Sequence, residues 1–176
     1  MISIGMNRRT QPSSGRLGVA LLGALLTISL GACGKTGAPS GSPLADSAFQ
    51  VEWLSAEVPA QMKPGEVATV KVKFRNISDQ VWPDPKTADP EGTGAYAVRF
   101  AWRWRTSDEM TTGEGTSLRT DLTEPLGPGR ETTLAIDVTA PKQPGQYRLQ
   151  FDLVQELVGF FEDRGAKLEI VPVNVQ

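Results

Sequence analysis

Apolar and polar residues alternate with a period of two through most of the chain after residue 48. This period places successive side chains on opposite faces of an extended strand, one face suited to a core and one to water. The pattern predicts antiparallel strands that are each covered on one side. The apolar members of the runs are Phe49, Val51 and Trp53; Ala68, Val70, Val72 and Phe74; Tyr96, Val98, Phe100, Trp102 and Trp104; Leu134, Ile136 and Val138; Tyr147, Leu149, Phe151 and Leu153; and Val171, Val173 and Val175.

Turn-forming residues separate these runs. Gly and Pro cluster at residues 63–65, 83–94, 127–129 and 141–145, where they favour tight turns. A short run at residues 118–122 supplies a further strand, and no window shows the apolar period of an amphipathic helix. The sequence therefore predicts an all-β fold, a two-sheet β-sandwich of about seven antiparallel strands. Buried side chains are expected at Val72, Phe74, Phe100, Trp102, Ile136, Tyr147, Leu149 and Phe151.

Residues 1–32 have the composition of a secretory leader. Three arginines precede an uncharged run at residues 17–30, which is short for a membrane-spanning helix. The run ends in Leu-Gly-Ala-Cys at residues 30–33, which resembles the lipobox of bacterial lipoprotein signals. The resemblance implies that residues 1–32 are a lipoprotein signal peptide and that Cys33 carries a lipid anchor, without a spanning helix. The alternative for Cys33 is a buried structural thiol.

The segment that follows predicts a tether. Residues 33–47 are rich in Gly, Ser, Pro and Ala and have no apolar period, as flexible linkers do. The folded domain is then expected at residues 48–176, which is long enough for one sizeable core. Gly34 rather than Asp follows the cysteine, and in lipoproteins this favours the outer membrane of the bacterial cell envelope, facing the periplasm or the exterior.

The composition excludes most catalytic chemistry. The chain has no His and one Cys, which removes His-based triads, His metal ligands and thiolate clusters. Its 18 basic and 20 acidic residues nearly balance, so nucleic acid is not an expected partner. Asp84, Asp89 and Glu91 could bind calcium through oxygen, but such loops usually contact only solvent. We expect no enzyme activity, no cofactor and no metal.

Several motifs in order along residues 63–175 resemble an immunoglobulin-like module. They are Pro64-Gly65, Asn76, Trp82, Ala140-Pro141 and Pro144-Gly145-Gln146-Tyr147. This order is similar to the four-tryptophan domain of autophagy cargo receptors and to modules appended to bacterial glycosyltransferases and surface proteins. The resemblance implies an immunoglobulin-like sandwich in which Tyr147 takes the tyrosine-corner position. It implies no single function, because such modules bind proteins, bind glycans or space other domains.

Two sets of side chains have a structural and a functional interpretation. Trp53, Trp102 and Trp104 could stack on sugar rings, but their strand parity favours the core. Arg99, Arg103 and Arg105 share the outer face of one strand and could bind an anion. Ion pairs across the sheet are favoured instead, because the neighbouring strand is expected to carry Asp152 and Glu156.

The connection between the last two strands is the best binding candidate. Phe160 and Phe161 are adjacent, so they cannot both point inward from a strand. Trp82, beside Pro83 near a loop, could join them at the same end of the sandwich. An exposed aromatic anchor is typical of interface hot spots, whereas the alternative is that these rings close the end of the core.

These features together predict a non-catalytic module of the cell envelope. It is expected to recognise a protein partner or an envelope glycan through its end loops and one sheet face. The alternative is a protease-inhibitor lipoprotein, in which an exposed loop enters the enzyme's cleft.

Overall fold

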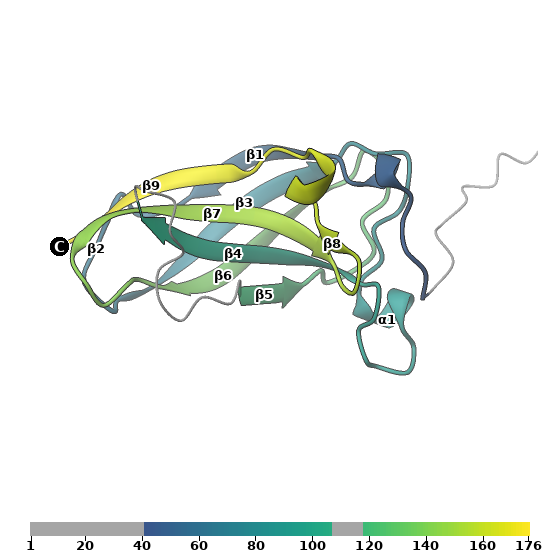
Figure 1. Cartoon of the computed structure of the whole chain (residues 1–176), viewed down its shortest axis with the longest axis horizontal. Helices are drawn as coiled ribbons and strands as arrows, with labels where there is room; N and C mark the ends of the chain where they lie inside the picture. The colour runs from purple at the N-terminus through teal and green to yellow at the C-terminus, as the bar shows by residue number, and fades with distance from the viewer. Residues whose placement is uncertain (1–40, 107–117) are drawn as a thin grey trace, which may run out of the picture. The chain divides into compact units, whose positions relative to one another are not determined.

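The computed structural model describes residues 41–106 and 118–176 and contains two packed β-sheets (Figure 1). One sheet has the strand order β1-β3-β6, and the other has the order β2-β9-β7-β4-β5 with β8 paired to β7. The strands are β1 (Val51–Glu57), β2 (Gln61–Met62), β3 (Val67–Asn76), β4 (Val98–Thr106), β5 (Leu118–Asp121), β6 (Glu131–Thr139), β7 (Gly145–Gln155), β8 (Gly159–Phe160) and β9 (Glu169–Val175). The short helical elements are η1 (Asp46–Ala48), α1 (Pro85–Ala88) and η2 (Glu162–Arg164).

The all-β prediction is confirmed, and the fold is an immunoglobulin-like β-sandwich. Each predicted strand corresponds to one in the structure, namely β1, β3, β4, β5, β6, β7 and β9. The two-residue strands β2 and β8 were not predicted, because they are too short to show a period. The pairing of β2 with β9 is parallel, so the expectation of an entirely antiparallel sandwich is wrong at this pair.

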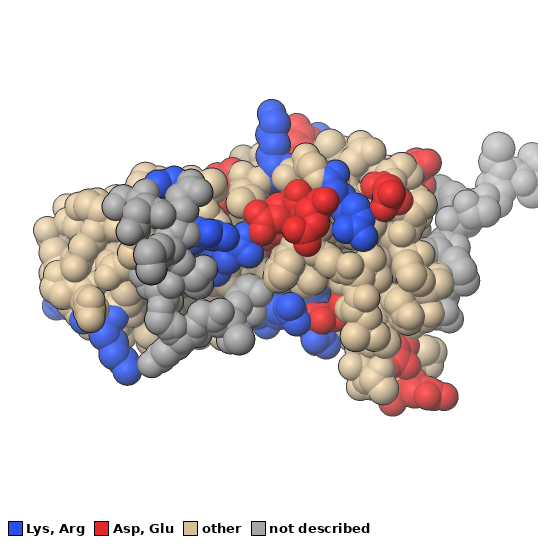
Figure 2. Space-filling model, viewed as in Figure 1, with Lys and Arg blue, Asp and Glu red and all other residues tan. Residues whose placement is uncertain are grey.

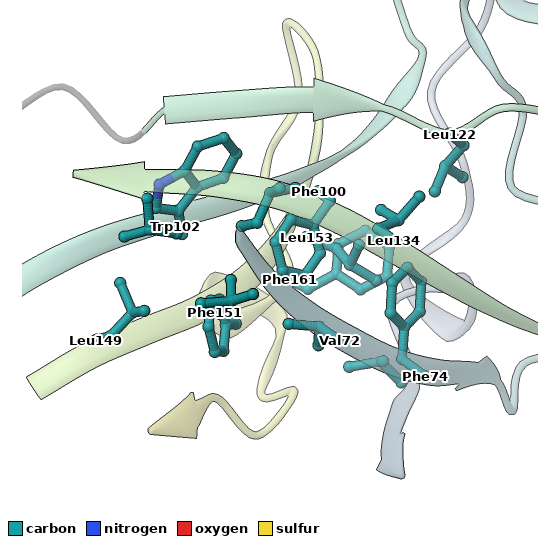
Figure 3. Packing of buried hydrophobic residues seen from close by; sticks show 14 of the residues in the cluster. Val72, Phe74, Phe100, Trp102, Leu122, Leu134, Leu149, Phe151, Leu153 and Phe161 are labelled. Carbon is teal, nitrogen blue, oxygen red and sulfur yellow. The ribbon is translucent and has the colours of Figure 1, made fainter. Parts of the chain in front are cut away.

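Aromatic rings from both sheets meet in the core (Figure 3). The Phe74 ring of β3 stacks on the Phe100 ring of β4 with centroids 5.8 Å apart, and the Phe151 ring of β7 lies 5.5 Å from Phe100. The side chains that the alternation predicted to be buried are all at most 8% exposed. Removing such large buried rings costs about 3–5 kcal/mol in typical cores, so this cluster holds the two sheets together.

Trp53 and Trp104 are only partly buried, unlike Trp102. Each lies at the margin of the core, where its indole Nε1–H donates to a backbone carbonyl, Trp53 to Lys167 at 2.7 Å and Trp104 to Thr139 at 2.8 Å. The prediction that these two rings lie in the core is therefore only partly correct. Their apolar faces pack against the core, and their Nε1–H groups lie at the margin of the sandwich, where they bond to backbone.

Tyr147 adopts the tyrosine-corner arrangement. It lies near the start of β7, and its hydroxyl donates to the backbone carbonyl of Gln143 at 2.9 Å. The hydroxyl thus bonds to backbone a few residues upstream, as in other immunoglobulin-like sandwiches. This local hydrogen bond fixes the entry of the chain into β7.

The predicted tether ends earlier than expected, because Leu44 belongs to the core. Leu44 is 5% exposed, and its backbone N–H donates to Oε1 of the buried Gln155 at 2.9 Å. Leu44 therefore packs on the domain ahead of the predicted boundary at residue 48, whereas residues 45–47 are exposed. Sequence periodicity could not reveal this, because one apolar side chain sets no period.

The predicted signal peptide at residues 1–32 and Cys33 lie outside the described residues. Within residues 41–106 and 118–176, no helix is long and apolar enough to cross a membrane. The core cluster of the described chain runs from Leu44 to Val175.

Candidate functional site

Phe161 and Trp82 close one end of the core. Both side chains are 0% exposed, and their rings meet edge to face with centroids 5.1 Å apart. Phe161 also contacts the Phe49 ring at 4.8 Å, and Trp82 Nε1–H donates to the Ala48 carbonyl at 2.8 Å. The expectation that Phe161 and Trp82 form an exposed anchor is therefore wrong, because neither ring has surface to offer a partner.

Phe160 lies on the outer face of the sheet that contains β4 and β7. It is partly buried and pairs with Val154. Its ring lies under two guanidinium groups, with Arg103 at 5.6 Å and Arg119 at 5.7 Å from the ring centroid. These cation–π contacts hold the Phe160 ring against the arginines of this face. Phe160 is therefore not a free anchor for a partner.

The exposed apolar residue of this connection is Leu157, which the sequence analysis missed. Its side chain is 78% exposed, and its φ is 66°. The turn at residues 155–158 is closed by the Val158 N–H, which donates to the Gln155 carbonyl at 3.0 Å. Leu157 takes the third position of this turn, where a positive φ favours glycine. An apolar residue inside a turn was the available sequence signal.

A second turn also has a non-glycine residue with a positive φ, and hydrogen bonds join it to the first turn. At residues 94–97 the Ala97 N–H donates to the Gly94 carbonyl, and Tyr96 in the third position of this turn has a φ of 61°. The side chain of Gln155 donates to the Tyr96 carbonyl at 3.0 Å, and the Glu156 N–H donates to the Ala97 carbonyl at 2.9 Å. We call residues 94–97 and 155–158 the paired turns.

Gln155 holds the paired turns from within the fold. It is 0% exposed, and besides Tyr96 it bonds the backbone of Ser42 and Leu44 at 3.1 and 2.9 Å. A buried amide whose donors and acceptor are used fixes the segments that it joins. The two strained turns are therefore presented on a rigid support at one end of the sandwich.

Basic and acidic side chains lie close together on the outer face of the sheet that contains β4 and β7 (Figure 2). Arg99 pairs with Asp121 at 2.7 Å and with Glu156 at 3.4 Å, and Arg119 pairs with Glu156 at 3.1 Å. The expected pairing of Arg99 with Glu156 is confirmed. Such pairs at a surface contribute little stability each.

Arg103 and Arg105 differ from the expected ladder. Arg103 pairs with Glu162 and donates to Gln150 Oε1 at 3.1 Å, and Arg105 donates to the same oxygen at 2.9 Å. Asp152 was the expected partner, but Glu162 of η2 takes that place. Residues 159–164 fold back over the sheet and place Glu162 beside Arg103. The alternation of apolar and polar residues along a strand does not predict this contact.

Asp152 is buried on this face, at 3% exposed. Its Oδ1 accepts from the Leu153 N–H at 2.7 Å, and its Oδ2 has no hydrogen-bond partner among the described residues. Burial raises the pKa of Asp152 to about 7. The Glu162 charge also raises it, whereas the backbone N–H groups of Leu153 and Glu162 and the Arg103 charge lower it. A single carboxyl group with a raised pKa, without a neighbouring nucleophile or cavity, does not make a catalytic site.

The acidic loop uses its carboxylates for backbone capping. Asp84 accepts from the Thr87 N–H at 3.0 Å and caps α1, and Asp89 accepts from the N–H groups of Glu91 and Thr93. The described ranges contain no group of three or more acidic or sulfur residues that could hold a metal ion. These hydrogen bonds explain why the acids gather in this loop.

Comparison with solved structures finds likeness at low sequence identity. No family model matches the chain, and no curated protein matches it. A CARDB domain from Pyrococcus furiosus is 14% identical over 72% of this chain and 84% of its own, with a TM-score of 0.41. The sporulation control protein Spo0M of Bacillus subtilis is 14% identical over 72% of this chain and 49% of its own, with a TM-score of 0.43. A mutant β-glucosidase of Listeria innocua is 16% identical over 72% of this chain and 16% of its own, with a TM-score of 0.40.

Proposed function

We propose that the chain is a non-catalytic binding module of the bacterial cell envelope, anchored through a lipid on Cys33, that contacts a protein partner with its paired turns. The observation that carries the proposal is Leu157, which is 78% exposed with a φ of 66°. The lipobox-like residues 30–33 support the anchor and the location.

The strain at Leu157 supports a functional role. A left-handed conformation costs a non-glycine residue about 1–2 kcal/mol, and such strain persists where the surroundings over-determine it, often at binding sites. Glycine at this position would remove the strain, whereas leucine adds an apolar side chain to the surface. The hydrogen bonds of Gln155 and Glu156 fix the backbone of the turn that carries Leu157, so binding need not pay the entropy of ordering this backbone.

The chemistry of the surface favours a protein over a glycan. The large hydrophobic residues exposed in residues 41–106 and 118–176 are all aliphatic, namely Val67, Ile77, Leu118, Leu157 and Ile170. Sugar recognition by stacking requires a flat exposed aromatic ring, and Phe160 is engaged by two arginines. An exposed aliphatic side chain gains free energy when an apolar pocket of a protein buries it.

The turn geometry argues against the inhibitor alternative. An inhibitory loop offers a protease extended backbone, in the manner of an added strand. The turn at residues 155–158 is instead closed by the bond from the Val158 N–H to the Gln155 carbonyl. A binding module therefore fits this loop better than an inhibitor.

The proposal is tested by placing a photoreactive amino acid at position 157 of the full chain in its native cell. Val67 provides the matched control position, because it is an aliphatic residue, 61% exposed, on the other sheet. We expect irradiation to give one protein adduct at position 157 that is absent at position 67. Equal adducts at both positions, or adducts to polysaccharide alone, would contradict the proposal.

A further inference from the structure

The outer edge of β6 has unpaired backbone groups. Ala140 N–H donates to the Glu66 carbonyl and Asn76 N–H to the Arg130 carbonyl, and hydrogen-bonded pairs alternate along an antiparallel ladder. With the printed register, the even-numbered residues of β6 therefore bond to β3. The N–H and C=O groups of Thr133, Ala135 and Asp137 point away from β3, and no strand of the described residues pairs with them.

Trp104 supports this assignment independently. Its Nε1–H donates to the Thr139 carbonyl at 2.8 Å, so the carbonyl of an odd-numbered residue does point outward. Thr139 is thereby satisfied from within the chain. The open part of the edge is then the stretch from Thr133 to Asp137.

This edge has few of the features that protect strand edges. Proteins blunt exposed edges with short strands, bulges, Pro or charged side chains, above all Lys. The other edge strands of the described chain have such features: β1 has a register shift between Trp53 and Ser55, β5 has four residues including Arg119, and β2 has two residues. β6 has nine residues in unbroken register with β3 and contains neither Pro nor Lys. Its two acids are engaged within the chain, Asp137 by the Thr69 hydroxyl and Glu131 by Lys73 and Arg75.

We propose that the β6 edge is an interface between two copies of this chain, which pair β6 with β6 antiparallel about a two-fold axis at Ala135. This register sets Thr133 opposite the partner's Asp137, and Ala135 opposite its own copy. The smallest side chain of the edge lies on the axis, and each outward residue from Thr133 to Asp137 exchanges N–H···O bonds with its counterpart. The interface is isologous, as in most closed dimers.

The charges are compatible with this register. Glu131 falls opposite Thr139, and Asp137 opposite Thr133, so no like charges face each other. Glu131 already pairs with Lys73 and Arg75 within one copy. The two Asp137 residues stand about 14 Å apart, at ~3.4 Å per residue over the strand, beyond the ~8 Å screening length at physiological salt.

The test is thiol cross-linking of the full chain in the membranes of the producing cell, with Ala135→Cys as the probe. Cα atoms of a hydrogen-bonded pair lie about 5.5 Å apart, within the range that a disulfide spans. Lys71→Cys is the matched control, because Lys71 is the exposed cross-strand neighbour of Ala135 on β3. Two such thiols would be about 14 Å apart across three strand spacings of ~4.8 Å. The wild-type chain corrects for Cys33, its one cysteine.

We expect a cross-linked dimer with Ala135→Cys that is absent with Lys71→Cys and in the wild type. Adding Thr133→Pro should abolish it, because proline removes an outward N–H without removing a bond to β3, whereas Thr133→Val should retain it. A yield equal to that of Lys71→Cys, an adduct to a different protein, or no effect of Thr133→Pro would each overturn the proposal. The edge lies on the opposite sheet from the sheet that contains β7, so this result is independent of the function proposed for the paired turns.

Discussion

Phe160 and Phe161 are adjacent in sequence and have opposite environments. Phe161 is 0% exposed between Phe49 and Trp82, whereas Phe160 is partly exposed beside two arginines. The alternation rule requires that one of two neighbours leaves the core. It cannot say which one, because the answer depends on where β8 ends and η2 begins.

Truncation of these two rings should have different effects on stability. Phe161→Ala should lower the free energy of unfolding by about 3–5 kcal/mol, as for large aromatic residues in cores. Phe160→Ala should lower it by no more than about 1–2 kcal/mol, because it loses two partly exposed cation–π contacts. Urea unfolding of both variants measures the difference. Equal losses would mean that the two rings share one environment.

Asp152 gives the stability a specific pH dependence. Its pKa is raised from 3.8 to about 7, so between these values the folded protein holds a proton that the unfolded chain has released. Stability must then fall as pH rises from about 4 to about 7 and level off above, by up to about 4 kcal/mol at ~1.36 kcal/mol per pKa unit. The ion-paired Glu131, with its pKa lowered to about 2, is ionised throughout this window.

Asp152→Asn should remove this dependence. The amide is neutral at every pH, so the variant should match the wild type near pH 4 and exceed its stability at pH 8. Urea midpoints at these two pH values measure the effect, and the difference from the wild type cancels other groups such as Glu169, whose pKa burial also raises. If the variant were less stable than the wild type at pH 8, the ionised Asp152 carboxylate would stabilise the folded state. Burial would then not disfavour its charged form, which would contradict the prediction.

At the scale of elements, the alternation of apolar and polar residues predicted the strands that are long enough to show it. The seven longer strands and their buried faces follow from alternation, because each run contributes several apolar residues to one face. The paired turns, the fold-back at η2 and the packing of Leu44 could not be predicted this way. Each depends on a single residue whose partners lie far away in sequence, as Gln155 lies 111 residues from Leu44.

The segment before β1 therefore belongs to the folding unit. Fragment 48–176 should be less stable than fragment 41–176, because it loses the buried Leu44, typically worth about 2–5 kcal/mol. It also leaves Gln155 Oε1 buried without its donor, which costs roughly 1–3 kcal/mol more. The urea midpoints of the two fragments measure this loss. Identical midpoints would restore the domain boundary at residue 48.

At the scale of the whole molecule, the proposed lipid anchor at Cys33 can be tested by mutation. Cys33→Ser should leave an unprocessed precursor and abolish incorporation of a fatty-acid analogue, because we propose the cysteine thiol as the acceptor of the lipid. Metabolic labelling followed by gel analysis measures both effects. Ser47→Ala, a small substitution outside the lipobox-like residues, should be processed and labelled as the wild type is. Labelling of the Cys33→Ser variant would contradict the anchor.

The central claim is that the paired turns bind a protein through Leu157. The most direct measurement is the Kd of the cross-linked partner, once identified, for the wild type, Leu157→Ala and Val67→Ala. Leu157→Ala should weaken binding at least ~30-fold, since a hot-spot loss of about 2 kcal/mol or more corresponds to that ratio. Val67→Ala, at the comparably exposed control position, should bind as the wild type does. Wild-type affinity in Leu157→Ala, or equal losses in both variants, would contradict the account.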